Sequence, residues 1–293
     1  MPISRDETLT PPVWPNGHRN RKGHQPPEVL FDDDFDKGFS NWRNHQGGNT
    51  IDAPLSRTAL RAFGGSSKSL VLSTGSRPAT GSIKSAACSA YNNTSRWVDS
   101  GLVKFETWLT LGGADLDNSP HNFMIGIDTQ EWNDVHRGFY RLICRRFRGG
   151  DQSGPMERDN HWALTGDIPD KGAFEIPAMN GNPAPPYPGD NENKMNWFYV
   201  SLTVDMDYMN PDGGRGRYHE VQIGPYTYDV RNLGAGRGKQ LPQLKSSVGA
   251  GPFTGGLNFG LGIGNRTVYN AAGPSWLLVG RARGLWYPNA EQD

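Results

Sequence analysis

The chain has 293 residues, and its 38 glycines and 22 prolines make up about a fifth of them, well above the usual share of about 12%. Because both residue types interrupt helices, this composition argues against a helical bundle, a coiled coil and a doubly wound α/β fold. An aromatic content of 11% is enough for a core and opposes disorder. The 30 basic side chains balance 30 acidic ones, so overall charge directs the chain toward neither nucleic acid nor an anionic membrane.

Residues 1–28 are predicted to form an extended, proline-rich, basic arm. This arm is either a solvated leader or a segment that docks on a neighbouring subunit or an anionic surface. Docking would use Trp14 as an apolar anchor and Arg19, Arg21 and Lys22 as charged contacts. The sequence shows no apolar signal segment and no run near the ~18 apolar residues of a membrane span. We therefore expect a cytoplasmic or virion-associated protein with no membrane contact.

Residues 29–293 are predicted to form one all-β domain, an antiparallel two-sheet jelly-roll sandwich. Apolar and polar residues alternate most clearly in Leu102–Leu111, Asn122–Asp128 and Trp197–Met206, so one face of each strand should pack on the core. Turn residues separate about eleven short candidate strands. They are Val29–Phe31, Ser69–Ser73, Gly81–Lys84, Leu102–Leu111, Asn122–Asp128, Gly138–Phe147, Trp197–Met206, Arg217–Ile223, Tyr226–Val230, Leu257–Gly264 and Trp276–Trp286.

An acidic run follows the first predicted strand. In an extended conformation Asp32, Asp34 and Asp36 would share one side, and carboxylates at this spacing can bind Ca²⁺. The same run can instead be a solvated edge whose charges prevent pairing with another strand. Calcium is therefore a possible ligand, and no cofactor is required.

The two cysteines, Cys88 and Cys144, do not have the spacing of a metal site. One disulfide is possible, but two buried thiols are favoured because cysteine is commonly buried in its reduced form. Basic and aromatic residues are interleaved from Arg137 to Arg148, over the predicted Gly138–Phe147 strand. With zero net charge, ion pairs or a subunit contact explain this pattern better than nucleic acid does.

Residues 148–196 are predicted to be a long irregular insert, because four prolines near its end, between 183 and 188, cannot donate ladder hydrogen bonds. Long loops of this kind are commonly functional or form interfaces. Trp197 and Tyr199 follow the insert and could pack beneath it.

A hairpin joins the Trp197–Met206 and Arg217–Ile223 strands through the turn Asn210-Pro-Asp-Gly-Gly. We expect Asp205 to lie near Tyr218, Thr203 near Glu220, and Ser201 near Gln222. The outward face would then combine aromatic rings with acids and amides, which suits the apolar faces and hydroxyl rims of sugars. The predicted glycan-binding residues are Trp108, Trp197, Tyr199, Tyr218, Glu220 and Gln222.

The order of these features resembles the concanavalin A-like jelly-roll superfamily, which includes laminin-G-like modules and glycoside hydrolase family 16. The resemblance spans roughly Val29–Pro288. It rests on the opening Leu30-Phe31-Asp32-Asp33-Asp34-Phe35 with Phe39 and Trp42, on the later hairpin, and on the closing Trp276-Leu-Leu-Val. Family 16 hydrolases carry E-x-D-x-x-E on one strand, whereas the nearest match here, Glu157-Arg-Asp159, lacks the third acid. The resemblance therefore implies a fold and transfers no catalytic residue.

Two functions remain open from the sequence. The first is a non-enzymatic glycan-binding or structural jelly roll in a homo-oligomer or larger assembly, for example a phage-like virion component such as a tail or head-decoration protein. The second is a polysaccharide-active hydrolase or lyase of the same fold. Its candidate acids are Glu106, which should face outward beside Trp108, and Glu220, Asp205 and Asp128.

Overall fold

The computed structural model describes residues 26–44, 50–51, 55–59, 63–73, 85–113, 122–130, 137–148, 157–168, 171–187, 197–210, 214–233, 239–240, 256–266 and 275–288. Every helix or strand element in these ranges is a β-strand. None of these ranges contains a helix long and apolar enough to cross a membrane. The predicted arm lies almost wholly outside the described residues, as does the predicted strand Gly81–Lys84.

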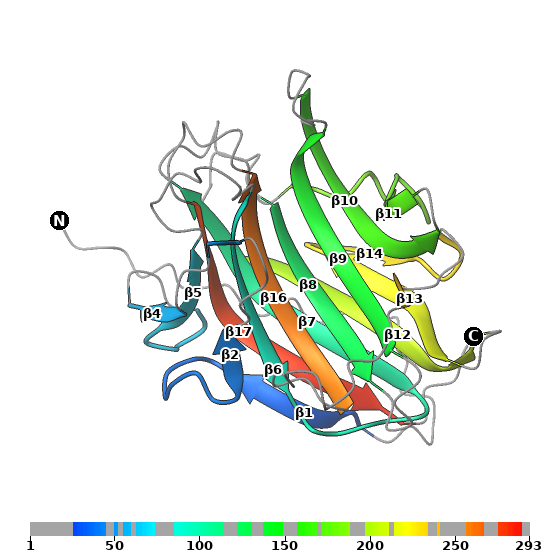
Figure 1. The fold of residues 1–293 in the computed structure, drawn as a ribbon, viewed down its shortest axis with the longest axis horizontal. Helices are drawn as coiled ribbons and strands as arrows, with labels where there is room; N and C mark the ends of the chain where they lie inside the picture. Colours follow the sequence, from blue (N-terminus) through cyan, green and yellow to red (C-terminus); the bar gives the residue numbers. More distant parts are fainter. Residues whose placement is uncertain are drawn as a thin grey trace.

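Two sheets pack face to face and form the sandwich (Figure 1). Sheet A has the order β14 (Tyr226–Asp229), β13 (Arg215–Ile223), β12 (Phe198–Met209), β7 (Leu102–Gly113), β17 (Ser275–Tyr287), β5 (Ser69–Ser73) and β4 (Ser56–Thr58), and β1 (Glu28–Asp33) also pairs with β17. Sheet B has the order β11 (Lys171–Glu175), β10 (Glu157–Ile168), β9 (Arg137–Arg148), β8 (Asn122–Gln130), β16 (Gly256–Arg266), β6 (Ser85–Asn93) and β2 (Trp42–Asn44). Two short strands complete sheet B: β15 (Lys239–Gln240) beside β9, and β3 (Thr50–Ile51) beside β6.

The predicted all-β, antiparallel two-sheet jelly-roll sandwich is confirmed. All described strand pairs are antiparallel except β3 with β6. The alternation that predicted the faces is also confirmed, because the apolar members of β7, β8 and β12 point between the sheets. The buried set is Val103, Phe105, Leu109, Leu111, Phe123, Ile125, Ile127, Val200, Leu202, Val204 and Met206.

Aromatic rings from both sheets meet in the core. Phe31 of β1 lies 5.0 Å from Phe259 of β16, and Phe105 of β7 lies 5.5 Å from the same ring, both edge to face. A Cβ on Gly284 would lie 2.5 Å from the Phe31 ring, so only glycine lets this ring lie on β17. Edge-to-face contacts across the layers add to the stabilisation that comes from burying the rings.

The prediction of an irregular insert over 148–196 is wrong for its central part. Residues 157–168 form β10, which pairs with β9, and residues 171–175 form β11, which extends sheet B. The sequence did not predict β10 because the segment is mostly polar, and only Trp162, Ala163 and Leu164 form a buried apolar run. The proline stretch is irregular as expected, and its carbonyls accept hydrogen bonds: Trp162 Nε1 donates to Pro186 O at 2.9 Å.

The strand register places the two cysteines far apart. Cys88 pairs with Ile263, Ile263 with Phe123, and Phe123 with Cys144, so two strands of sheet B lie between the cysteines. Three inter-strand spacings of about 4.8 Å put their Cα atoms roughly 14 Å apart. A disulfide requires less than about 7 Å, so these cysteines cannot be bridged within one chain.

Candidate functional site

A cavity of about 930 Å³ opens on the outer face of sheet A. Neighbouring strands supply its floor, because outward side chains of β7, β12, β13 and β17 lie side by side in the sheet. The end of β1, the turn after it and residues 63–66 form its rim. The floor residues are Glu106, Trp108, Tyr199, Gln222, Arg281 and Arg283.

Glu106 is the central charged group of this cavity and is only 1% exposed. The Tyr199 hydroxyl donates a 2.8 Å hydrogen bond to Glu106 Oε2, and Lys104 Nζ lies 3.8 Å from the same oxygen. Arg283 Nη1 lies 3.1 Å from Oε1. Burial raises the pKa of Tyr199 well above its ordinary value, and the Glu106 carboxylate raises it further. Tyr199 therefore stays a neutral donor.

Two arginines from β17 connect Glu106 to the rim. Arg281 makes a bidentate pair with Asp32, with Nε–Oδ1 at 2.7 Å and Nη2–Oδ2 at 2.6 Å. Arg283 Nε lies 3.5 Å from Asp32 Oδ2, so Arg283 spans Asp32 and Glu106. The alternate residues Arg281 and Arg283 point outward from one strand, whereas Ala282 is buried.

Aromatic rings form the apolar wall of the cavity. Trp108 meets Tyr199 edge to face at 4.9 Å and stacks on Phe63 at 5.2 Å. Phe63 also contacts Trp197 at 5.4 Å. A Cβ on Gly280 would lie 2.3 Å from Phe63 Cβ, so the glycine permits this close approach. Trp197 and Tyr199 thus pack in a cluster that includes Phe63, and the insert alone does not account for them.

The hairpin register agrees with two of the three predicted pairs: Thr203 pairs with Glu220, and Ser201 with Gln222. Asp205, however, pairs with Arg217, because the register shifts by one residue between Thr203 and Val204. This β-bulge turns Tyr218 to the inner face.

The prediction that Tyr218 belongs to the glycan-binding face is therefore wrong. Its side chain is 1% exposed and lies between the sheets. The hydroxyl accepts a hydrogen bond from Arg141 N at 2.9 Å and donates one to Thr165 O at 2.8 Å. Tyr218 is a structural link from sheet A to sheet B.

The four candidate acids are divided between the two sheets. Asp205 is fully buried, and Arg217 Nε donates to it at 3.0 Å. Glu220 is half-buried on β13 opposite Thr203. Asp128 lies on β8 of sheet B, where Arg137 binds both of its oxygens at 2.7–2.8 Å. Of the four, only Glu106 lines the cavity.

The prediction that Asp32, Asp34 and Asp36 share one side is also wrong. β1 ends at Asp33, and Phe35 adopts a left-handed φ of 63°, so the alternation stops there. Asp36 Oδ1 accepts hydrogen bonds from Ser66 Oγ and the Ser67 and Lys68 amides, whereas Asp32 binds Arg281. In the described ranges, no three His, Cys, Asp or Glu side chains form a group able to hold a metal ion.

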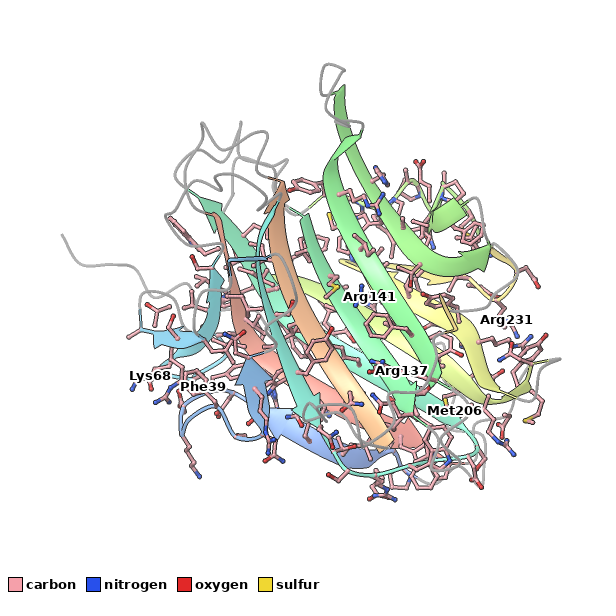
Figure 2. The ribbon with its side chains drawn as sticks, in the orientation of Figure 1. Phe39, Lys68, Arg137, Arg141, Met206 and Arg231 are labelled. Carbon is pink, nitrogen blue, oxygen red and sulfur yellow. The ribbon has the colours of Figure 1, made fainter. Side chains whose placement is uncertain are left out.

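The basic strand β9 belongs to sheet B, whereas the cavity lies on sheet A. Its side chains Arg137 and Arg141 are labelled in Figure 2. Arg137 is paired with Asp128, and Arg141 lies 3.6 Å above the Phe139 ring. Both cations are thus engaged within the sheet. The predicted arm residues Trp14, Arg19, Arg21 and Lys22 lie outside the described residues.

Arg281, Arg283 and Phe63 are site residues that the sequence did not reveal. The Arg-Ala-Arg alternation in the last strand is a signal that could have indicated two outward cations. Phe63 had no such signal, because its contact with Trp108 joins segments far apart in the chain.

No protein-family model and no curated protein matches the chain. Among solved structures it is similar to the cellulose-induced protein Cip1, with 12% identity and a TM-score of 0.44, over 87% of this chain and 96% of that one. It is also similar to the CBM2 module of the evolved Dit of Lactobacillus casei BL23 phage J-1, with 10% identity and a TM-score of 0.45, over 92% of this chain and 100% of that one. A third similar structure is an endo-1,3-β-glucanase from Streptomyces sioyaensis, with 11% identity and a TM-score of 0.43, over 90% of this chain and 99% of that one. These likenesses concern the fold alone.

Proposed function

We propose that this protein binds a carbohydrate, without cleaving it, in the cavity on the outer face of sheet A. One observation carries the proposal: a buried carboxylate, Glu106, lies on the cavity floor between an arginine and an aromatic wall. Sugar rings present apolar C–H faces and hydroxyls that both donate and accept hydrogen bonds. Aromatic rings with a few convergent polar groups match both properties.

The arrangement of carboxylates favours binding over hydrolysis. A glycosidase needs one carboxyl group as a proton donor and a second as nucleophile or base. In this cavity Arg281 binds both oxygens of Asp32, and Arg283 and Lys104 lie beside Glu106. Burial raises the pKa of Asp33, but its two oxygens accept hydrogen bonds from Ser40 and Trp42. Asp32, Asp33 and Glu106 therefore each have at least one hydrogen-bond partner within the protein.

Polysaccharide cleavage by a hydrolase or lyase is the second candidate function. It is favoured by the contact between Glu106 and the Tyr199 hydroxyl, because a tyrosine next to a carboxylate can take part in proton transfer. Turnover that depends on Glu106 and Glu220 would support it.

The test measures binding and turnover in parallel. The full chain is run through gels containing neutral or acidic polysaccharides, and the supernatants are assayed for reducing ends and for unsaturated sugar ends. We expect retardation without release of either product, and loss of retardation in Trp108→Ala and Gln222→Ala. Tyr208→Ala is the matched control, since Tyr208 is exposed and does not line the cavity.

Absence of retardation by every polysaccharide would overturn the proposal. Product release that disappears in Glu106→Gln and Glu220→Gln would replace it with the enzymatic function.

We further propose that the protein works within a homo-oligomer or larger assembly, such as a phage-like virion. This proposal rests on the arm over residues 1–28, with its prolines and basic residues. Light scattering on the full chain and on a variant lacking residues 1–25 tests it. A monomer at all concentrations in both would contradict it.

A further inference from the structure

We infer that the cavity selects a neutral glycan, through a hydroxyl that donates to Glu106 and accepts from Arg283, and excludes glycans whose corresponding group is anionic. This inference rests on the proposed carbohydrate binding and specifies its ligand class. It comes from two polar atoms on the cavity floor that have no hydrogen-bond partner in the described part of the chain.

The first atom is Glu106 Oε1. The other carboxylate oxygen, Oε2, accepts the Tyr199 hydrogen bond, but Oε1 is buried and accepts none. Arg283 Nη1 lies 3.1 Å from Oε1 as an ion pair without hydrogen-bond geometry. A buried carboxylate oxygen without a donor is rare in folded proteins, and a ligand donor would satisfy it.

The second atom is Arg283 Nε. It is buried and donates no hydrogen bond: Asp32 Oδ2 lies 3.5 Å away, as an ion pair without hydrogen-bond geometry. The cavity floor thus presents one acceptor and one donor that belong to a single Glu106–Arg283 pair. A hydroxyl is the group that supplies both complements, since its oxygen accepts and its proton donates.

An anionic group fits this pair poorly. A carboxylate, sulfate or phosphate could accept from Arg283, but it has no proton for Glu106 and would place like charges side by side. The charged residues that line the cavity reinforce this preference, because carboxylates outnumber cations. Four acids (Asp32, Asp33, Asp34 and Glu106) and three cations (Lys37, Arg281 and Arg283) line it.

The experiment compares ligands that differ only in charge. Neutral cello-, laminari-, manno- and galacto-oligosaccharides are titrated by calorimetry into the full chain, together with their C6-oxidised counterparts of the same linkage and length. We expect at least one neutral oligosaccharide to bind at least about tenfold more tightly than its oxidised counterpart.

Two variants assign the selectivity to the pair. Glu106→Gln removes the negative charge and should lower the ratio of neutral to acidic affinity. Arg283→Lys keeps the charge but removes the fixed Nε donor, and it should weaken neutral binding. Glu175→Gln, an exposed acid on β11 of sheet B, is the matched control and should change neither quantity. Near-ultraviolet circular dichroism checks folding, and Arg283→Lys provides the test if Glu106→Gln does not fold.

The outcomes separate the two proposals. If no oligosaccharide of either kind binds, both the proposed function and this inference are overturned. If the chain binds oxidised oligosaccharides as well as or better than neutral ones, the inference alone is overturned. The same holds if the variants leave the ratio and the neutral affinity unchanged.

Discussion

Phe63 stacks on Trp108 with ring centroids 5.2 Å apart and an interplanar angle of 29°. The two residues come from different parts of the chain, and the contact leaves Trp108 only 9% exposed. Phe63 therefore occupies part of the surface on which a sugar ring would stack. The Phe63 ring, which belongs to the rim of the cavity, thus covers Trp108.

Removing the Phe63 ring should expose Trp108. In Phe63→Ala, acrylamide should quench tryptophan fluorescence more strongly than in the unmodified chain, because the indole loses its cover. The chain contains nine tryptophans, so the assignment uses a second background. Phe63 also contacts Trp197, so in Trp108→Phe the Phe63→Ala change should raise quenching by a smaller amount. A change of equal size in both backgrounds would contradict the assignment to Trp108.

Gly280→Ala should displace Phe63 and so disturb its stacking on Trp108. The added Cβ would lie 2.3 Å from Phe63 Cβ, so the rim segment has to move, and overpacking of this kind typically costs about 1–3 kcal/mol. Urea unfolding measures the loss in free energy of unfolding. The cost should fall sharply in a Phe63→Gly background, where the clashing atom is gone. Equal costs in the two backgrounds would show that Phe63 is not the obstacle.

Tyr218→Phe should destabilise the sandwich. The hydroxyl satisfies the amide of Arg141 and the carbonyl of Thr165, and its loss leaves buried polar groups unpaired, at a cost of about 1–3 kcal/mol. Tyr208→Phe is the control, because its ring is exposed and surface changes usually stay within about 0.5 kcal/mol. Thermal unfolding of both variants measures the difference. Equal stability would contradict the role of Tyr218 as a link between the sheets.

His219 should make the stability of the fold fall as the solution becomes acidic. Burial lowers its pKa below 6.5, although Glu220 opposes the shift, and its Nδ1 has no hydrogen-bond partner in the described residues. Above pH 6.5 both the folded and unfolded states hold the neutral ring. As pH falls through 6.5 the unfolded state is protonated first, so the free energy of unfolding decreases, by at most about 1.4 kcal/mol per pH unit.

His219→Gln removes this titration. Urea unfolding from pH 7.5 down to pH 5 should therefore be less steep in the variant than in the unmodified chain. Identical slopes would assign the acid sensitivity to other groups.

The thiols of Cys88 and Cys144 should both remain reduced. Alkylation of the denatured chain without reductant should add two alkyl groups, measured by intact mass. Added reductant should leave the melting temperature unchanged, because the strand register keeps the cysteines two strands apart. Failure to alkylate either cysteine in a monomeric sample would contradict this register.

Much of the fold follows from local pattern. Alternating apolar residues in β7, β8 and β12 indicate both the strand and its buried face, because side chains on successive residues point to opposite sides. The outward position of Glu106 beside Trp108 follows from the same period. The sequence did not predict β10, because this strand is polar along most of its length. Only its pairing with β9 places Trp162 in the core.

By itself, then, the sequence determined the all-β class, the face of each regular strand and the outward pair Glu106–Trp108, since these depend on a period of two along one segment. Only the tertiary structure decided that Tyr218 turns inward, that Asp32 binds Arg281, and that Arg283 and Phe63 complete the cavity. A single extra residue at a bulge reverses every later side chain of a strand. Contacts between distant segments depend on strand order and register, which one sequence does not specify.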